Sequence, residues 1–143
     1  MNKLVAITIG DINGIGIDIL IKTWQDKKIK NFILITNIDI LIKVLKKRKI
    51  KIIFNQVNYK KNQFIYLKDK FNIFSYKANS LEDNTYKSLK YGHFLCKNKK
   101  CIGVITLPLR KDLIKDKIDK NFIGHTEFFQ KKDKKNERPS YRR

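Results

Sequence analysis

The residues best suited to bind a ligand or take part in catalysis lie near the C-terminal end of the chain, in the run Gly124-His125-Thr126-Glu127. This run places one of only two histidines beside a threonine, in a turn that a glycine opens. At the start of a short helix it would combine a titratable imidazole, a hydroxyl and exposed backbone N–H groups, which suits a small anionic substrate. The same residues are also typical of an ordinary helix start capped by Thr126. The rest of the chain has to distinguish these two interpretations.

A second run of candidate residues follows a predicted strand at residues 101–106. Pro108 cannot donate to the sheet ladder and favours extended geometry at the residue before it, so the chain must leave the sheet there. In open parallel sheets the carboxyl edge of the strands is where ligands bind. The pattern therefore predicts that Thr106, Arg110 and Lys111 face a common crevice.

A third run, Gly10 to Gly16, follows an apolar strand predicted at residues 4–9. Its three glycines allow a sharp turn and a close approach to a neighbour, and the apolar spacing after it predicts an amphipathic helix. A strand, a glycine loop and a helix in this order aim backbone N–H groups at an anion. The spacing matches neither the dinucleotide fingerprint nor the Walker motif, which favours a structural turn. Asp11 is a candidate for the rim of a pocket.

The elements that would position these residues can be predicted from hydrophobic periodicity. Strands are expected at 32–35 and 50–54, with an amphipathic helix at 38–45 between them. The basic run 46–49 suits the negative end of that helix dipole. This β-α-β-α-β alternation predicts the α/β class, with an open, mostly parallel sheet flanked by helices and joined by right-handed crossovers.

The middle of the chain is less regular, and short strands are expected at 63–67 and 71–74. A helix is predicted from about residue 80 to about residue 97, with His93 on its apolar side. A packed and hydrogen-bonded core histidine is favoured there over a metal ligand. A short helix is predicted around residues 113–118.

The chain has 143 residues, the length of one domain. Its formal net charge of +20 could indicate a nucleic-acid partner. Only five of its 33 cationic side chains are arginine, and three of those lie in the last six residues. Lysine is spread through every segment beside abundant isoleucine and asparagine, the residues that A- and T-rich codons supply. We therefore interpret most of the charge as genome bias, with a small basic nucleic-acid-binding protein as the alternative.

Two cysteines, Cys96 and Cys101, form neither a disulfide framework nor a usual zinc ligand set. The N-terminal segment lacks a signal-peptide pattern, and no apolar stretch is long enough to cross a bilayer. The sequence predicts a soluble cytoplasmic protein with reduced cysteines and no membrane partner.

Together the three runs resemble motifs of the 4-hydroxythreonine-4-phosphate dehydrogenases, NAD-dependent, metal-requiring enzymes of pyridoxal phosphate biosynthesis. Residues 10–18 are similar to the family's Gly-Asp-x-x-Gly-Ile-Gly loop with its following acidic position. Residues 106–111 are similar to its Thr-x-Pro-x-x-Lys strand exit, and residues 124–127 to its Gly-His-Thr-Glu turn. The resemblance extends over residues 1–130, nearly all of the chain outside the tail.

The resemblance implies that His125 and Thr126 bind the substrate, with Asp11, Thr106 and Lys111 as possible rim residues. It implies oxidation of the hydroxyl of a phosphorylated amino acid, 4-phosphohydroxy-L-threonine, by hydride transfer to NAD, after which the 3-oxo acid loses carbon dioxide. A divalent metal (zinc, magnesium or cobalt) would polarise the reacting oxygen. The implied architecture is a homodimer of a two-domain, isocitrate/isopropylmalate-dehydrogenase-like fold, of which this chain is a fragment.

The chain also departs from that family. The family's three metal-binding histidines follow the Gly-His-Thr-Glu turn, whereas residues 131–143 contain no histidine. A catalytic divalent site usually needs three protein ligands, so His93 cannot replace them and no metal ligand is assigned. The family's NAD-binding residues are missing as well. We predict a domain at 1–130 and a basic tail at 131–143 that is disordered or out of frame, and a chain inactive and poorly soluble alone.

Overall fold

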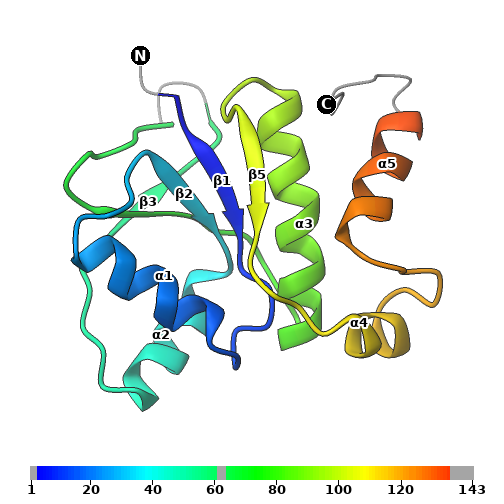
Figure 1. Cartoon of the computed structure of the whole chain (residues 1–143), viewed down its shortest axis with the longest axis horizontal. Helices are drawn as coiled ribbons and strands as arrows, with labels where there is room; N and C mark the ends of the chain where they lie inside the picture. Colours follow the sequence, from blue (N-terminus) through cyan, green and yellow to red (C-terminus); the bar gives the residue numbers. More distant parts are fainter. Residues whose placement is uncertain (1–2, 61–63, 136–143) are drawn as a thin grey trace.

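The computed structural model describes residues 3–60 and 64–135. Its described part is an α/β fold built on a five-stranded parallel sheet with strand order β3-β4-β2-β1-β5 (Figure 1). The predicted fold class is therefore confirmed. In chain order the elements are β1 (Val5–Thr8), α1 (Gly16–Gln25), β2 (Phe32–Ile35), α2 (Ile38–Lys47), β3 (Phe54–Val57), β4 (Phe71–Phe74), α3 (Leu81–Lys97), β5 (Gly103–Thr106), α4 (Lys111–Lys117) and α5 (His125–Lys135).

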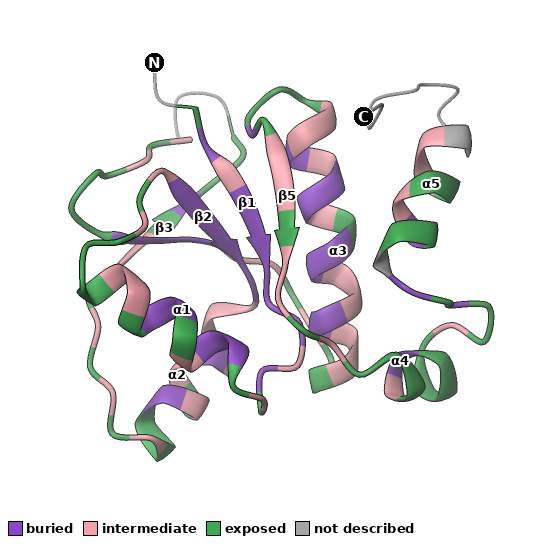
Figure 2. Ribbon diagram, in the orientation of Figure 1, coloured by how far each residue is buried: buried purple, intermediate pink, exposed green. Residues whose placement is uncertain are grey.

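The central strands β1 and β2 are buried along nearly all of their length because helices cover both faces of the sheet (Figure 2). Side chains of a strand alternate between its two faces. Ile7 and Leu34 accordingly pack in the cluster with α1 and α2, whereas Ala6 and Ile33 pack in the cluster that contains Leu95 of α3. Apolar strands of this kind are typical of parallel sheets covered on both sides.

A third apolar cluster joins α3, α4 and the start of α5. It joins Leu89 of α3 to Ile114 of α4 and to Phe122 and Phe128 around the start of α5. In Figure 1, α3 lies between β5 and α5, and α4 lies at the end of the molecule toward which β1 and β5 point. The segment that carries the Gly-His-Thr-Glu turn is thus held by α3 and α4.

Two predicted strands differ from the structure. The third strand is at 54–57, not 50–54, because Ile50 and Ile52 pack against the core from a coil and Ile53 is exposed. The expected strand at 63–67 is absent over residues 64–67, and residue 63 lies outside the described part. The predicted strands at 32–35 and 71–74 are confirmed.

The boundary predicted at residue 130 falls inside a helix, because α5 continues to Lys135. Residues 131–135 belong to this helix, and residues 136–143, the rest of the predicted tail, lie outside the described part. Asp133 on this helix bonds to His93, with 3.1 Å between Oδ1 and Nε2. His93 is buried and hydrogen-bonded, as predicted. No helix in the described ranges is both long and apolar enough to span a membrane.

Candidate functional site

The glycine loop and the strand exit form one unit at the carboxyl end of β1 and β5. The backbone N–H of Asp11 donates to the carbonyl of Pro108 over 2.7 Å. Gly10 has a φ of +64°, and a Cβ there would lie 2.3 Å from the Pro108 oxygen and 2.5 Å from the Leu107 oxygen. Glycine is required by both the backbone conformation and the close approach. Two of the three predicted motifs are thus joined by backbone contacts.

Hydroxyl groups of α3 anchor the ends of β1 and β2. The Thr85 hydroxyl donates to the carbonyl of Gly10 over 2.6 Å. The Ser88 hydroxyl accepts from the backbone N–H of Ile9 over 2.9 Å and donates to the carbonyl of Ile35 over 2.5 Å. All of these partners are buried, so each bond also satisfies a polar group that water cannot reach.

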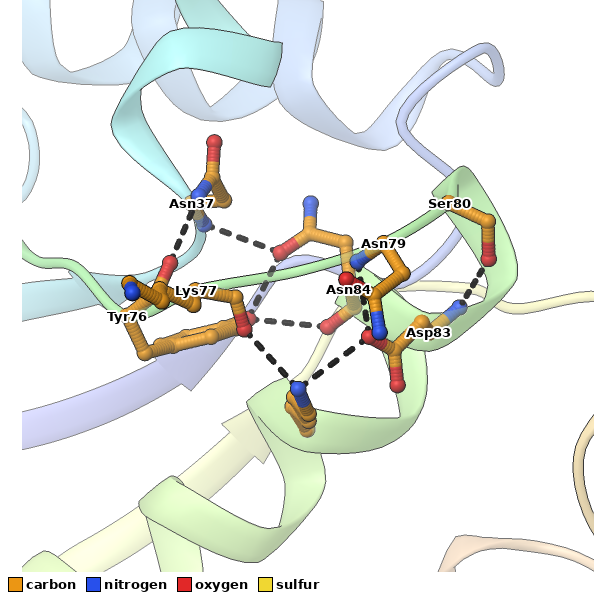
Figure 3. Close-up of polar contacts among 8 residues, drawn as sticks. Asn37, Tyr76, Lys77, Asn79, Ser80, Asp83 and Asn84 are labelled. Carbon is orange, nitrogen blue, oxygen red and sulfur yellow. Dashed lines mark hydrogen bonds and ion pairs between the residues drawn. The ribbon is translucent and has the colours of Figure 1, made fainter.

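The carboxyl ends of β2 and β4 are filled by a polar network centred on Asn84 of α3 (Figure 3). Its Oδ1 accepts from the backbone N–H of Asn37 over 2.9 Å and from the Tyr76 hydroxyl over 2.7 Å. Its Nδ2 donates to the Thr36 hydroxyl over 3.0 Å. Parallel sheets bind ligands at the carboxyl ends of their strands. At β2 and β4 this position is occupied by α3, so the part of the edge that is left for a ligand is the part near β5.

Arg48, at the end of α2, holds the glycine loop from its other side. Its guanidinium donates to Asp18 over 2.8 Å and to the carbonyl of Ile12 over 3.2 Å, with a longer bond of 3.5 Å to the carbonyl of Gly14. A planar fork with several donors suits such a set of diverging acceptors. The loop therefore has a defined shape.

The third motif lies against the start of α4. A Cβ built on Gly124 would be 3.7 Å from Cδ of Lys111 and 3.2 Å from Oε1 of Glu127. The Phe128 N–H donates to the Gly124 carbonyl over 3.0 Å, which closes the first turn of α5. Phe128 also contacts Tyr86 of α3, with 5.4 Å between the ring centroids. The Gly-His-Thr-Glu turn is thus next to the Thr-x-Pro-x-x-Lys exit in space.

The five predicted site residues occupy one region but not one cavity. Thr106 is half-buried and pairs in register with Thr8 at the end of β1, Lys111 is exposed at the start of α4, and Thr126 is exposed. His125 begins α5. Asp11 alone among them lines the small cavity between the glycine loop, α3 and α4, with Glu82, Thr85 and Arg110 in the same lining.

That cavity has a volume of about 50 Å³, enough for one or two water molecules at about 30 Å³ each. A ligand larger than this would have to extend onto the exposed surface formed by Lys111 and the start of α5. Arg110 is engaged there by Asp112, with nitrogen–oxygen distances of 3.1 and 2.8 Å. The Arg110 guanidinium holds the pKa of the Asp112 carboxyl below its usual range. Lys111 is the cation in this exit that the structure places beside the Gly124 turn.

The side chains that the structure describes form neither a metal ligand set nor a pyrophosphate cradle. Among the side chains that the structure describes, no three of His, Cys, Asp or Glu lie close enough together to hold a metal ion. The glycine loop is equally unlike a pyrophosphate cradle, because the space beside Gly10 is filled by the Leu107 and Pro108 carbonyls. No residue can be assigned to NAD or to a metal from this structure.

Arg48, Thr85 and Ser88 were missed as supports of the site by sequence reasoning. Ser88 and Thr85 lie on a helix 79 and 75 residues away from the strand end they hold, and no local pattern links them. The sequence contained one weak indication of the role of Arg48, because it is the only arginine before residue 110 and lies within a run of lysines. Arginine in place of lysine can mark a site that needs a fork of donors.

Comparison with solved structures shows the same fold in dehydrogenases. A structure assigned as a 4-hydroxythreonine-4-phosphate dehydrogenase from Salmonella typhimurium matches 90% of this chain and 44% of its own, with a TM-score of 0.75 and 20% identity. The 4-hydroxythreonine-4-phosphate dehydrogenase from Klebsiella pneumoniae matches 87% of this chain and 42% of its own, with a TM-score of 0.72 and 17% identity. The chain spans less than half of either protein. No protein-family model and no curated protein matches the sequence.

Proposed function

We propose that this chain binds a phosphorylated hydroxy-amino acid, 4-phosphohydroxy-L-threonine, as the substrate-binding part of a dehydrogenase of pyridoxine 5'-phosphate biosynthesis. The observation that supports it is the convergence of three motifs from distant parts of the sequence. The loop at Asp11 bonds to Pro108, and Gly124 lies beside Lys111. The fold that the chain shares with 4-hydroxythreonine-4-phosphate dehydrogenases agrees with this proposal.

The proposed roles follow from the exposed rim. The ammonium group of Lys111 and the unpaired N–H groups in the first turn of α5 attract the phosphate, since a helix N-terminus carries a partial positive charge. His125 and Thr126 are the proposed substrate-binding pair, and Thr126 is exposed. Phe122 and Phe128 are buried and fix the turn against α3, so the rim is ordered before the ligand arrives.

The rest of the reaction is proposed from the resemblance alone. NAD would accept the hydride, a divalent metal would polarise the oxygen being oxidised, and the enzyme would act as a cytoplasmic homodimer. The described residues provide no three-ligand metal group. We therefore expect the isolated chain to bind the phosphorylated substrate without turning it over.

Calorimetric titration with 4-phosphohydroxy-L-threonine tests the binding proposal. Lys111→Gln and Thr126→Ala should each weaken binding about fivefold, the effect of losing roughly 1 kcal/mol at an exposed contact. Lys115→Gln is the matched control, because Lys115 is also exposed on α4, one turn away, and it should change binding less than about twofold. Equal losses in both lysine variants would reduce the effect to bulk charge and contradict the proposal.

Turnover is tested separately by following NADH absorbance with the same substrate, NAD and a divalent metal. No NADH should form with the isolated chain. Clear turnover would contradict the inference that its residues are insufficient for catalysis while leaving the binding proposal intact.

A further inference from the structure

A groove of about 510 Å³ lies between α3 and α5, within the size range of small-molecule sites. Four lysines and two aromatic rings contribute to its lining: Lys87, Lys90, Lys97, Lys132, Tyr91 and Phe94. None of the five candidate substrate residues is part of it. The groove is about ten times as large as the cavity beside Asp11, of about 50 Å³.

One face of α3 supplies most of this lining. Lys87, Lys90, Tyr91, Phe94 and Lys97 follow one another at intervals of three, one, three and three residues, so they lie along a single stripe of the helix. At 1.5 Å per residue this stripe is about 15 Å long. Cationic side chains flank the two rings. The same surface therefore offers lysines that can bind phosphates and aromatic rings that can contact an apolar ring of a ligand.

The aromatic part of the groove is held in place by neighbouring rings. Tyr91 stacks on Tyr76 with 4.8 Å between centroids, and Phe94 packs edge-on against Tyr59 at 4.7 Å. Rings fixed in this way lose little conformational entropy when a ligand binds. They therefore form a preorganised apolar wall.

The positive charge of the groove exceeds the charge that neighbouring carboxylates neutralise. Lys87 pairs with Asp83 over 3.2 Å. Among the described residues, no ion pair involves Lys90 or Lys97. Like charges around one groove repel, and a bound anion relieves that repulsion.

The lysines of the groove also influence the protonation of His93, which lies in the groove lining. Burial lowers the pKa of His93, and the charges of Lys132 and Lys97 lower that pKa further, while Asp133 opposes them. A neutral imidazole at the wall leaves the lysines as the groove's cations. The positive charge of the groove thus also affects a buried side chain in its wall, the imidazole of His93.

We propose that the groove between α3 and α5 binds a compact organic polyphosphate of the nucleoside triphosphate class. The lysine ammonium groups hold the phosphates, and the rings of Tyr91 and Phe94 contact the base. A triphosphate presents anionic groups along its length, which suits lysines spread along the groove better than the single phosphate of a monophosphate does. The bounded volume favours a compact ligand over an extended strand.

The experiment is a fluorescence anisotropy titration of the full chain with a ribose-labelled ATP analogue at about 0.15 M salt, where long-range attraction is screened. Binding should be detectable below about 1 mM. The double variant Lys90→Gln/Lys97→Gln should weaken it about tenfold. The matched control is Lys43→Gln/Lys47→Gln on α2, which removes the same charge from another helix and should change binding less than about twofold.

Competition then identifies the ligand class. Unlabelled ATP should displace the probe about tenfold more effectively than AMP, because AMP lacks two of the phosphates, and more effectively than tripolyphosphate, because tripolyphosphate lacks the base. Equal weakening by both double variants would assign the binding to bulk charge and overturn the proposal. Tighter, groove-dependent binding of a single-stranded oligonucleotide would overturn it in favour of nucleic acid. Far-ultraviolet circular dichroism confirms that each variant is folded.

Discussion

Gly10 is the residue at which the glycine loop and the strand exit meet most closely. Its left-handed conformation costs other residues about 1–2 kcal/mol, and a Cβ would also overlap the Pro108 carbonyl oxygen at 2.3 Å. Because the overlapping atoms belong to the backbone, a side-chain rotation cannot relieve the clash. The identity of this residue therefore determines whether Asp11 can bond to Pro108.

Gly10→Ala is expected to lower the free energy of unfolding by about 3 kcal/mol or more, as strain and overlap add. Gly103→Ala is the matched control, because a Cβ on Gly103 meets no atom within 4 Å. That control should be neutral or stabilising by about 0.5 kcal/mol, since glycine is unfavourable within a strand. Urea denaturation followed by circular dichroism measures both. Similar effects of the two variants would contradict the packing described for Gly10.

At the scale of elements, α5 is attached to α3 through an apolar contact and a polar one. Phe128 enters the cluster with Leu89, and Asp133 bonds to His93 one helical turn further on. The apolar contact is independent of pH, whereas the polar contact contains a titratable ring. The docking of α5, which carries the proposed substrate-binding turn, should therefore depend on pH.

The sign of that dependence follows from the lowered pKa of His93, for which burial is the main cause. As the pH falls, the unfolded chain binds a proton at His93 before the folded chain does, so stability decreases. The melting temperature should be level above about pH 7 and should fall as the pH decreases below about 6.5, the ordinary pKa of histidine. In His93→Gln the dependence over this range should flatten, and in Asp133→Asn it should persist, since the carboxylate opposes the shift. Thermal melts across the range test this, and an unchanged slope in His93→Gln would refute it.

The elements differ in how far the sequence could predict them. Buried strands such as β2 are continuous apolar runs, and α2 has a clear helical periodicity, so both are predicted correctly. The edge strand β3 is misplaced because Asn55 and Gln56 are polar, whereas the neighbouring Ile52 packs against the core from a coil. Edge strands need less apolar surface than central ones, so periodicity is a weak guide to their limits.

The candidate site was predictable as three motifs but not as an arrangement. The strand ends indicated the correct edge of the sheet for Thr106, because parallel strands present their carboxyl ends together. The bond from Ser88 to Ile9 connects residues 79 positions apart, and the contact between Gly124 and Lys111 depends on how α4 turns. Such contacts arise from tertiary packing, which a single sequence does not reveal.

At the scale of the whole molecule, the edge of the sheet formed by β5 carries exposed apolar side chains. Among the described strands β5 pairs only with β1, so its other edge carries backbone groups without a strand partner. Ile105 on β5 is 50% exposed and Ile102 just before it is 68% exposed. An edge strand with exposed apolar side chains is a template for association with another chain. The poor solubility expected of the isolated chain would thus originate at β5.

Ile105→Lys tests this origin, because a lysine on an edge strand opposes pairing with a second strand. Light scattering of the wild-type chain should rise with concentration, and the variant should reduce that rise at least about twofold. Ile19→Lys is the matched control, because Ile19 is 57% exposed on α1 and the substitution adds the same charge away from the sheet edge. Since the chain already carries a net charge of +20, one more charge alone should have little effect on solubility. Equal improvement in the two variants, or a wild-type chain that stays monomeric at every concentration, would exclude β5 as the site of association.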